Sequence, residues 1–580
     1  MRVIPQKIKK QVVDFLDNTY NEKVNVITPD SLTKEQLLKC KPPHIDDEQW
    51  VQNCRWIVHS IIEQTFDKRF TINEGDFVPL YSKILKENCG NSYKGFIIGL
   101  MDCGVIEGDG EYSSKRHESF GFRLTEKYEK SPLKYITLSD TFLVKRIRNY
   151  RKKRIAELKE KAAPIAHLVR WLTYKKLTLD KEAALTFLET YKRKLTNELA
   201  KRQLKPKYKA RQTAFIMKRY NRIKFQIENW EGHKPFSIDD SAGRLYSSIT
   251  SLPSLFRNFL SYNTEELVSL DIKNSQPLHF LSMLKKEFWK DYTSGITLYK
   301  LNKDLQSYLQ DQQGYPDNIM FHESHESLAG KGTDLYTFKK LVETGKLYEF
   351  ICNRFFNKYK TKGGIDRFST RSKSKKEFLH MMYHNPRAQF SSAKDVFSGF
   401  KTLFPFEAGI MSLMKKRKHN DFPIILQKIE AQMLLHMVAK KVFITNPDIP
   451  LFTIHDSIIT TKQYGKIVCE ILEEEYKSLL GILPQLETTE FTEHNAWNEI
   501  SKYTKAKVDQ ADIEISNATT EIPDGLRFLK CEHWNFNKMY KQFTEEKGKL
   551  KVVEFADYNT IPVGLKKVSE SQPATRRIKK

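Results

Sequence analysis

The sequence predicts an α+β protein built from several folded units. Two apolar runs of strand length, residues 267–272 and 451–459, are separated by long stretches with helical periodicity, which favours a mixture of helices and sheet. The 580 residues are 40% hydrophobic and 12% aromatic, which is enough apolar material for large cores and excludes a disordered chain. At about 100–200 residues per domain, this length predicts roughly three to five units.

The net charge indicates a polyanionic partner. The chain has 97 Lys and Arg residues against 71 Asp and Glu residues, a formal charge of +26. Most of this excess lies in residues 141–230, which hold 26 basic and 7 acidic residues interleaved with apolar ones at helical spacing. We expect amphipathic helices whose basic faces contact the phosphate backbone of nucleic acid. The alternative is an ordinary solvated helix face.

The N-terminal part predicts a helical region followed by a small mixed module. Residues 1–70 are expected to be helical and carry no motif. The elements expected next are two short helices and then the two strands of a hairpin: 78–88, 92–103, 105–107 and 120–124. This order resembles the winged-helix family, which implies a module that docks DNA or a protein partner. A plain α+β packing module is the alternative.

Cysteine usage and hydropathy indicate a cytoplasmic protein, with a mitochondrial location left open. The seven cysteines stand singly, without a C-x-x-C pair, which predicts reduced thiols and no structural zinc. No run of about 18 apolar residues predicts a membrane span. The first twenty residues contain Asp14 and Asp17 and lack an apolar segment, which disfavours a secretory signal. The basic end, residues 576–580, reads as a tail.

Two aspartates in strand-like segments are candidate metal ligands. Asp271 ends the first apolar run, and Asp456 stands at the centre of the second. Either alone is more often a turn or cap residue. On adjacent strands of one sheet, the pair would hold two Mg²⁺ ions, or Mn²⁺, about 3.5–4 Å apart, as an in-line phosphoryl transfer requires. The sequence leaves that adjacency open.

Three segments around these aspartates resemble a polymerase superfamily, the one that joins family A DNA polymerases to the single-subunit RNA polymerases of phages and mitochondria. Residues 270–276 (LDIKNSQ) resemble its motif A, 454–457 (IHDS) its motif C, and 369–383 its motif B helix. Four residues of the last segment recur every four positions and therefore form one helix stripe: Arg371, Lys375, Leu379 and Tyr383. The resemblance implies that Asp271 and Asp456 hold the two metal ions and that this stripe binds the nucleotide.

Further residues take roles from the same resemblance. Lys375 would neutralise the phosphates as pyrophosphate leaves, and Tyr383 would close over the base. Residues 240–248 resemble an element whose arginine, Arg244, supports the primer end. Residues 427–431 resemble a helix that places Gln427 in the minor groove, where His455 would join it. Minor-groove acceptors are nearly the same for every base pair, so such donors check pairing geometry without reading sequence.

The resemblance implies a right-hand polymerase with an antiparallel palm sheet and helical fingers and thumb. The expected divisions are a helical region 1–70, a winged-helix-like module 71–135, a basic thumb-like region 136–235, palm 236–290, fingers with an insertion 291–420, palm 421–505, and a C-terminal extension 506–580. His384 stands where the family usually has glycine, which puts the nucleotide pocket in question there. No D-x-E strand with partner acids is found in the N-terminal half, so we expect no proofreading exonuclease.

Product chemistry depends on Gln276. This residue follows Asp271 by five positions, where DNA polymerases carry a glutamate that excludes the ribose 2′-OH and RNA polymerases carry glycine. Its bulk favours a DNA polymerase acting on a DNA primer-template with deoxynucleoside triphosphates. Residues 370–372, His279 and Ser457 resemble the RNA branch instead, which keeps an RNA polymerase or primase on a promoter duplex as the alternative. A DNA-binding replication initiator without catalysis is the second alternative, and a Mg²⁺ nuclease is disfavoured by the motif B helix.

Overall fold

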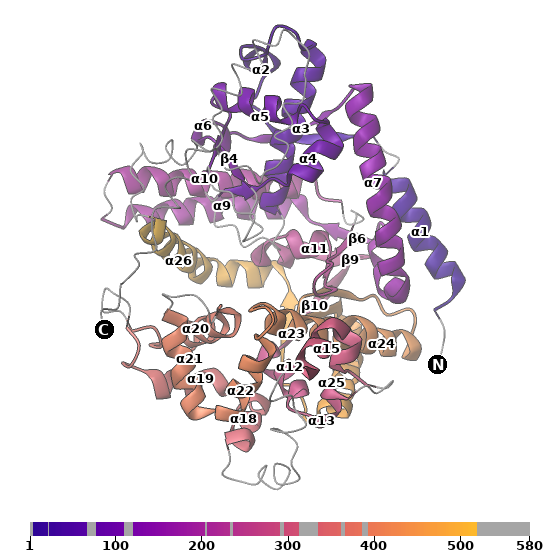
Figure 1. Ribbon diagram of the computed structural model, residues 1–580, viewed down its shortest axis with the longest axis vertical. Helices are drawn as coiled ribbons and strands as arrows, with labels where there is room; N and C mark the ends of the chain where they lie inside the picture. Colours follow the sequence, from indigo (N-terminus) through magenta and orange to yellow (C-terminus); the bar gives the residue numbers. More distant parts are fainter. Residues whose placement is uncertain are drawn as a thin grey trace, which may run out of the picture.

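The computed structural model combines helices with antiparallel sheets, as the predicted α+β class requires (Figure 1). It describes residues 4–20, 23–66, 77–109, 120–203, 206–231, 236–290, 295–311, 334–360, 366–385 and 392–518. Residues 312–333, where we expect the insertion in the fingers, and residues 519–580, most of the expected C-terminal extension with its basic tail, lie outside the described residues. None of the described helices is both long and apolar enough to cross a membrane.

An N-terminal unit forms the top of the molecule in Figure 1. Its strands are β1 (Asn25–Pro29), β2 (Val78–Pro79), β3 (Ile106–Gly108), β4 (Gly121–Leu124) and β5 (Leu133–Thr137). Its helices are α2 (Lys34–Leu38), α3 (Asp47–Phe66), α4 (Ser82–Cys89), α5 (Tyr93–Asp102) and α6 (Glu126–Glu129). Strand β4 pairs with both β2 and β3, and β1 pairs with β5.

The prediction of an all-helical region 1–70 that ends before a separate module was wrong. Strand β1 lies inside that region and pairs along its whole length with β5, from Asn25 opposite Thr137 to Pro29 opposite Leu133. Buried side chains from both ranges share one hydrophobic core. The pairing joins residues more than 100 positions apart, so no local pattern reveals it. The predicted helix 78–88 also begins later, at Ser82, because Val78 and Pro79 form β2.

Helix α5 is enclosed by the N-terminal core. Seven of its ten residues are buried, and Gly99 packs against the Trp50 ring. A Cβ at Gly99 would lie 2.2 Å from that ring, so glycine is required for this approach. The helix therefore has no continuous polar face to offer a partner.

The structure joins Cys40 and Cys103 in a disulfide, with Cα atoms 5.8 Å apart. The prediction that every cysteine is a reduced thiol was wrong for this pair. The two residues are 63 positions apart, so the spacing of cysteines in the sequence gives no sign of the bond. Four of the described cysteines are free: Cys54, Cys89, Cys352 and Cys469.

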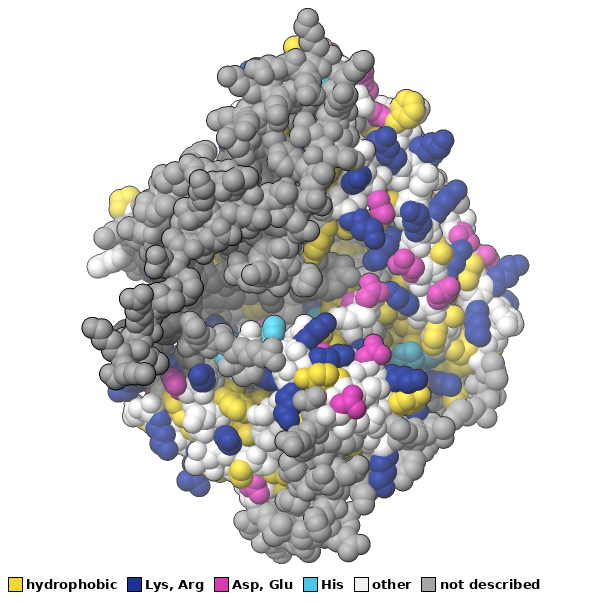
Figure 2. Space-filling view, in the orientation of Figure 1, with side chains coloured by type: hydrophobic (Ala, Val, Ile, Leu, Met, Phe, Trp, Pro, Cys, Tyr) yellow, Lys and Arg dark blue, Asp and Glu magenta, His cyan; other side chains and the backbone are white. Residues whose placement is uncertain are grey.

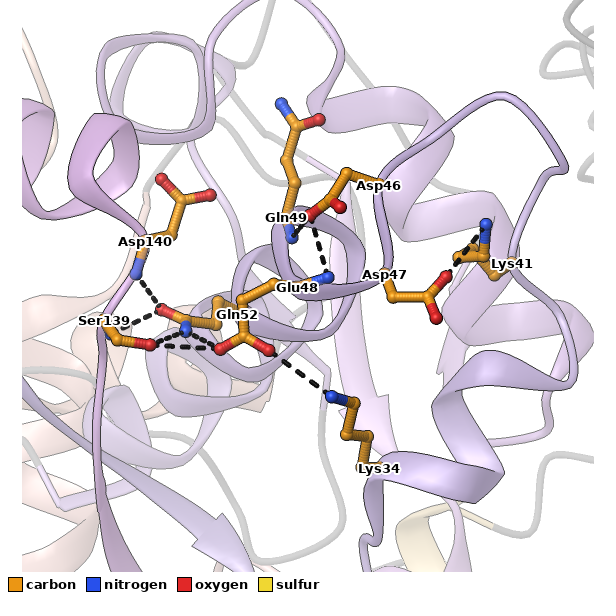
Figure 3. A network of polar contacts seen from close by, with 9 residues as sticks. All are labelled: Lys34, Lys41, Asp46, Asp47, Glu48, Gln49, Gln52, Ser139 and Asp140. Carbon is orange, nitrogen blue, oxygen red and sulfur yellow. Dashed lines mark hydrogen bonds and ion pairs between the residues drawn. The ribbon is translucent and has the colours of Figure 1, made fainter.

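A polar network fixes the start of α7 (Thr141–Ala162) on α3 (Figure 3). Gln52 of α3 accepts hydrogen bonds from the backbone N–H groups of Ser139 (2.7 Å) and Asp140 (2.6 Å). The Asp140 side chain then caps α7 by accepting from the Leu143 N–H at 2.8 Å. Ser139 Oγ donates to Glu48 at 3.0 Å, so four side chains hold this junction: Gln52, Asp140, Ser139 and Glu48.

Helix α7 connects two hydrophobic cores. Its Leu143 and Ile147 belong to the N-terminal core, whereas Ile155 and Leu158 belong to the larger core of the rest of the chain. It packs beside α1 (Gln6–Tyr20) and α4. The predicted single basic region 136–235 is therefore divided, because α9 (Lys181–Ala200) and α10 (Pro206–Glu228) pack on each other elsewhere.

The central sheet has the order β11-β12-β10-β9-β6, and β13 also pairs with β10. The strands are β6 (Leu177–Leu179), β9 (Leu260–Tyr262), β10 (Glu265–Ile272), β11 (Phe452–Ile454), β12 (Ser457–Thr461) and β13 (Leu486–Phe491). A separate pair is β7 (Ser237–Ile238) with β8 (Leu245–Tyr246). Both predicted apolar runs are thus strands of one sheet, and β10 lies between β12 and β13.

Helices surround this sheet in the lower half of Figure 1. Those before the motif B segment are α8 (Ala166–Val169), α11 (Ser248–Ser251), α12 (Ser275–Met283), α13 (Lys286–Trp289), α14 (Leu298–Leu301), α15 (Lys303–Gln310), α18 (Asp334–Glu343) and α19 (Leu347–Phe355). The others are α20 (Arg371–Tyr383), α21 (Ser392–Leu403), α22 (Pro405–Met414), α23 (Asp421–Ala431), α24 (Ala439–Thr445), α25 (Gly465–Leu480) and α26 (Glu493–Ala518). A π-helical segment, Gln432–Val438, joins α23 to α24.

One buried acid makes the stability of this core depend on pH. Glu407 in the first turn of α22 is fully buried, and neither carboxyl oxygen has a hydrogen-bond partner among the described residues. Burial, with a smaller effect of the Asp334 charge, raises the Glu407 pKa from 4.5 to about 8. The folded state therefore holds a proton that the unfolded chain releases between these two pH values.

We expect Glu407→Gln to remove this dependence. Between pH 4.5 and 8, the free energy of unfolding of the parent protein should fall relative to that of the variant, by up to about 1.4 kcal/mol per pH unit. Urea unfolding of both proteins at pH 5.5 and 7.5 measures the difference in slope, and any constant offset from the buried amide cancels. Parallel pH profiles would show that Glu407 is not protonated in the folded state.

Candidate active site

Asp271 and Asp456 meet where β10 pairs with the β11–β12 hairpin. Asp271 stands directly opposite Ser457 in the β10–β12 register. Asp456 precedes Ser457 and, with His455, forms the two-residue turn of the hairpin. His455, at the first of these two positions, has a φ of 52°, and a positive φ there is typical of tight two-residue hairpin turns. The adjacency that the sequence left open is therefore present.

The charges around Asp271 interact strongly. Burial first, and then the Asp456 carboxylate, raise the Asp271 pKa to about 6. A hydrogen bond donated by Ser457 Oγ to Asp271 Oδ1 and the Lys375 ammonium act in the opposite direction. Two carboxylates and one ammonium thus lie within electrostatic reach of each other. The carboxylates repel, and a bound cation would relieve that repulsion.

The two carboxylates fit an open Mg²⁺ site better than a metal site that is closed by protein ligands on all sides. Among the described residues, no group of three or more His, Cys, Asp or Glu side chains could hold a metal ion. Mg²⁺ is usually held by one or two carboxylates together with water and substrate phosphates. Asp271 and Asp456 would supply such carboxylates and leave positions for phosphate oxygens.

Glu487 is an acid that the sequence reasoning missed. It lies on β13 directly opposite Asp271, on the other side from Ser457, and its charge contributes to the raised Asp271 pKa. Its own side chain is mostly exposed and lies 3.9 Å from the Lys273 ammonium. Nothing in the sequence around Glu487 indicates that β13 pairs with β10.

Helix α20 presents the predicted stripe. Thr370 caps it by accepting a hydrogen bond from the Lys373 N–H at 3.2 Å. Ser374, Phe378, Met381 and Met382 form its buried face. On the opposite stripe, Arg371 and Lys375 are exposed, Leu379 is half-buried, and Tyr383 is 37% exposed, with most of its ring covered. The predicted helix 369–383 is confirmed to within two residues.

The members of this stripe have different surroundings. Lys375 lies close enough to Asp271 for its charge to lower the pKa of that carboxyl. Arg371 donates instead to Glu349 of α19 at 2.5 Å, and its guanidinium lies 5.6 Å from the centre of the Tyr348 ring. Arg371 is therefore held by α19 in this conformation.

A second cluster joins Arg244, Gln276 and Glu430. Arg244 Nη2 donates to Glu430 Oε2 at 2.8 Å, and Gln276 Nε2 donates to the same oxygen at 2.7 Å. Glu430 is only 1% exposed. Burial raises its pKa to about 7 even though Arg244 opposes that rise, and the Asp456 charge adds to it. The cluster therefore lies close enough to Asp456 for their charges to interact.

Glu430 was also missed by the sequence reasoning. It belongs to the segment 427–431 in which only Gln427 was selected. Its partners are 186 and 154 residues away, so only the folded chain identifies it as the link. The π-helical segment that follows α23 starts two residues after Glu430, and such segments are frequent at functional sites.

Tyr383, Gln427 and His455 complete the surroundings. Burial, with contributions from Glu430 and Asp456, raises the Tyr383 pKa to about 12, while Arg244 and a hydrogen bond with Gln427 oppose it. The His455 ring lies 5.7 Å from the Tyr246 ring, centre to centre, in an edge-on contact. The residues predicted for primer, nucleotide and metal thus converge on one region.

The end of α20 is fixed by a buried lysine. Lys415 Nζ donates to the carbonyl oxygens of His384 at 3.0 Å and Met381 at 3.3 Å. Burial lowers the Lys415 pKa to about 8. A cation at a helix C-terminus satisfies terminal carbonyls and interacts favourably with the helix dipole. His384, the residue that stands where the polymerase superfamily usually has glycine, therefore accepts this hydrogen bond through its backbone carbonyl.

Three comparisons with known proteins gave matches to solved structures alone. No protein-family model matches the chain, and no curated protein matches it. Among solved structures, 93 chains match. One is the POL domain of Pol1 from M. smegmatis in complex with a DNA primer-template and dNTP, with 10% identity, 61% of this chain and 73% of that chain covered, and a TM-score of 0.35. A TM-score this low carries no argument about fold or function.

We expect divalent cations to stabilise the protein through Asp271 and Asp456. Without a cation, Asp271→Asn should be at least as stable as the parent, because it removes carboxylate repulsion. Adding Mg²⁺ at about ten times its dissociation constant should stabilise the parent by about 1.4 kcal/mol and leave the variant nearly unchanged. Thermal melts with and without MgCl₂, balanced with NaCl for ionic strength, measure this. An equal shift in both proteins would place the ion elsewhere.

Proposed function

We propose that this protein is a template-directed nucleic-acid polymerase that transfers nucleotides by a two-metal-ion mechanism, with DNA as the favoured product. One observation carries the proposal: Asp271, Asp456 and Lys375 converge from β10, the β11–β12 turn and α20. Phosphoryl transfer needs carboxylates that bind metal ions and a cation that neutralises the leaving phosphates. The two aspartates near the sheet and the lysine on α20 would supply both.

In this mechanism, each side chain has a defined task. Asp271 and Asp456 would hold two Mg²⁺ or Mn²⁺ ions, which when bound stabilise the attacking and leaving oxygens of the in-line displacement. Ser457 orients the Asp271 carboxylate through its hydrogen bond. Lys375 would neutralise the departing pyrophosphate, and Tyr383 would cover the base of the incoming nucleotide. The primer 3′-hydroxyl would attack the α-phosphorus, forming the new phosphodiester bond and releasing pyrophosphate.

The Arg244–Glu430–Gln276 cluster supports control of primer and sugar. Glu430 accepts from both partners, which fixes the guanidinium of Arg244 and the amide of Gln276. A held Gln276 keeps its bulk where a ribose 2′-OH would project, which favours deoxynucleotides. RNA synthesis is the second candidate, because Ser457 and residues 370–372 resemble the RNA branch.

Parts of the fold support a division of the chain into the palm, fingers and thumb of a right-hand polymerase. The sheet that includes β9, β10, β11, β12 and β13 would be the palm, and α18 to α22 would belong to the fingers. The pair α9 and α10 would be the thumb, which narrows the thumb-like region predicted as 136–235. A proofreading exonuclease is not part of the proposal.

The N-terminal unit is proposed to be a winged-helix-like module. Support comes from the order α3, β2, α4, α5, β3, β4 and from the sheet order β2-β4-β3. The buried α5 cannot place side chains in a DNA groove, so base reading through that helix is not proposed. A protein partner or the phosphate backbone fits the other surfaces of the unit better.

Primer extension tests the proposal directly. With a labelled primer on a DNA template and Mg²⁺, the protein should lengthen the primer, and Asp271→Ala or Asp456→Ala should reduce the rate by at least about 10³-fold. Glu474→Ala, which removes one exposed acid of α25, is the matched control. Shortening of the primer instead would indicate a nuclease, and no change in length would favour a DNA-binding protein without catalysis.

The sugar preference has its own test. Gln276→Gly should raise ribonucleotide incorporation relative to deoxynucleotide incorporation, because it removes the bulk beside the sugar. Glu430→Gln should shift the ratio in the same direction, because it weakens the hydrogen bonds that hold Gln276. Single-nucleotide insertion with dNTP or NTP gives both ratios. Unchanged ratios in both variants would show that Gln276 does not select the sugar. If the parent protein inserts only ribonucleotides, the protein is an RNA polymerase.

A further inference from the structure

A basic concave surface lies on the N-terminal unit, on elements that contribute nothing to the candidate active site. Its cavity of about 490 Å³ is lined by Lys83, Lys86, Glu87, Gly90, Asn91 and Arg146, from α4, the turn that follows it and α7. In Figure 2, Lys and Arg side chains gather at the upper right, where Figure 1 places α4 and α7.

The charge of this surface is not balanced. Within the part of the chain that the structure describes, Lys83, Lys86 and Arg146 form no ion pair or hydrogen bond through their side chains. Glu87 is the single acid in the lining. The Lys86 charge also acts on Lys94, whose pKa is lowered by burial first and by Lys86 second. Crowding of like charges costs free energy, and an anionic ligand would offset that cost.

Helix α7 extends the basic surface beyond the cavity. Seven of the ten residues from 145 to 154 are Lys or Arg, and none is acidic. Four of these cations beyond Arg146 are exposed and have no ion pair with a described residue: Lys145, Arg148, Lys152 and Lys153. Ten helical residues span about 13 Å, which corresponds to about four phosphates along one strand of duplex DNA.

The surface is shaped before any ligand arrives. Gly90 has a φ of +79°, a backbone conformation that favours glycine, and the Arg146 guanidinium lies against this turn, since a Cβ there would be 2.6 Å from Nη1. The Gln52 hydrogen bonds fix the start of α7 (Figure 3). A ligand therefore meets cations whose helices are already in place.

We propose that this surface, formed by Lys83, Lys86, Arg146 and the exposed cations of α7, is a second nucleic-acid site that binds the phosphate backbone without reading sequence. Cations in a row suit a repeating anion. The cavity lining contains no apolar side chain, whereas the core of a protein–protein interface is rich in aromatic and apolar residues. The site does not depend on polymerase activity, because its residues take no part in catalysis.

Salt-dependent binding tests the site. Binding of a labelled blunt DNA duplex is measured by anisotropy from about 50 to 200 mM salt for the parent and for Lys83→Gln/Lys86→Gln/Arg146→Gln. With a slope of about −0.9 per phosphate contact, the triple variant should lower the steepness by about 2 to 3. Its loss of affinity relative to the parent should therefore be about 16- to 60-fold larger at about 50 mM than at 200 mM salt. Duplex RNA and single-stranded DNA show which nucleic acid fits best.

A second variant separates local contact from net charge. Lys401→Gln/Lys441→Gln/Lys466→Gln removes three exposed lysines on α21, α24 and α25 and leaves the same net charge. It should keep the slope and affinity of the parent. Equal losses in both variants, or no loss in either, would overturn the site. Binding of an acidic polypeptide in preference to every nucleic acid would overturn the choice of partner. Because no nucleotide is added, the outcome is independent of whether the protein extends primers.

Discussion

The candidate site depends on one strand being paired on both sides. At Asp271, β10 faces Ser457 of β12 on one side and Glu487 of β13 on the other. This pairing determines which side chains meet, because residues directly opposite in antiparallel strands lie about 5 Å apart. A shift of the register by one residue would turn Asp271 to the opposite face of the sheet and separate it from the Ser457 hydroxyl. The β10–β12 pairing also positions the hairpin turn at His455 and Asp456. Backbone hydrogen bonds between the strands therefore place the Asp271 and Asp456 carboxylates near each other.

Charge in this region is arranged in two linked layers. Asp271 and Asp456 are partly open to solvent, whereas Glu430 is buried and accepts hydrogen bonds from Arg244 and Gln276 through one carboxylate oxygen. Removing one partner of a buried pair leaves an uncompensated charge, which costs far more than a surface pair contributes. Glu430 therefore holds Arg244 and Gln276 in one arrangement near Asp271 and Asp456. Lys415 has a comparable effect at the end of α20, where it holds the backbone beside Tyr383.

The sequence predicted the local features of this protein well and its long-range links poorly. Both aspartate-bearing strands, the helix 369–383 with its stripe, and the elements of the N-terminal module follow from periodicity, caps and turns that lie within a few residues. The β1–β5 pairing, the Cys40–Cys103 disulfide, Glu430 and Glu487 depend on partners 63 to 216 residues away in the chain. The charge of residues 141–230 was visible, but its division between α7 and the α9–α10 pair was not, since it depends on which core each helix enters.

Helix α7 also determines the distance between the basic surface and the loop that carries Arg244. Arg146 lies on the basic surface near its start, and Lys161 near its end pairs with Asp240, four residues before Arg244. The fifteen residues between the two cations rise about 22 Å along a helix. Gln52 holds the N-terminal junction, and α7 contributes side chains to both cores, so the helix keeps the basic surface and the loop that carries Arg244 a set distance apart. About six to seven base-pair steps of duplex rise by the same length.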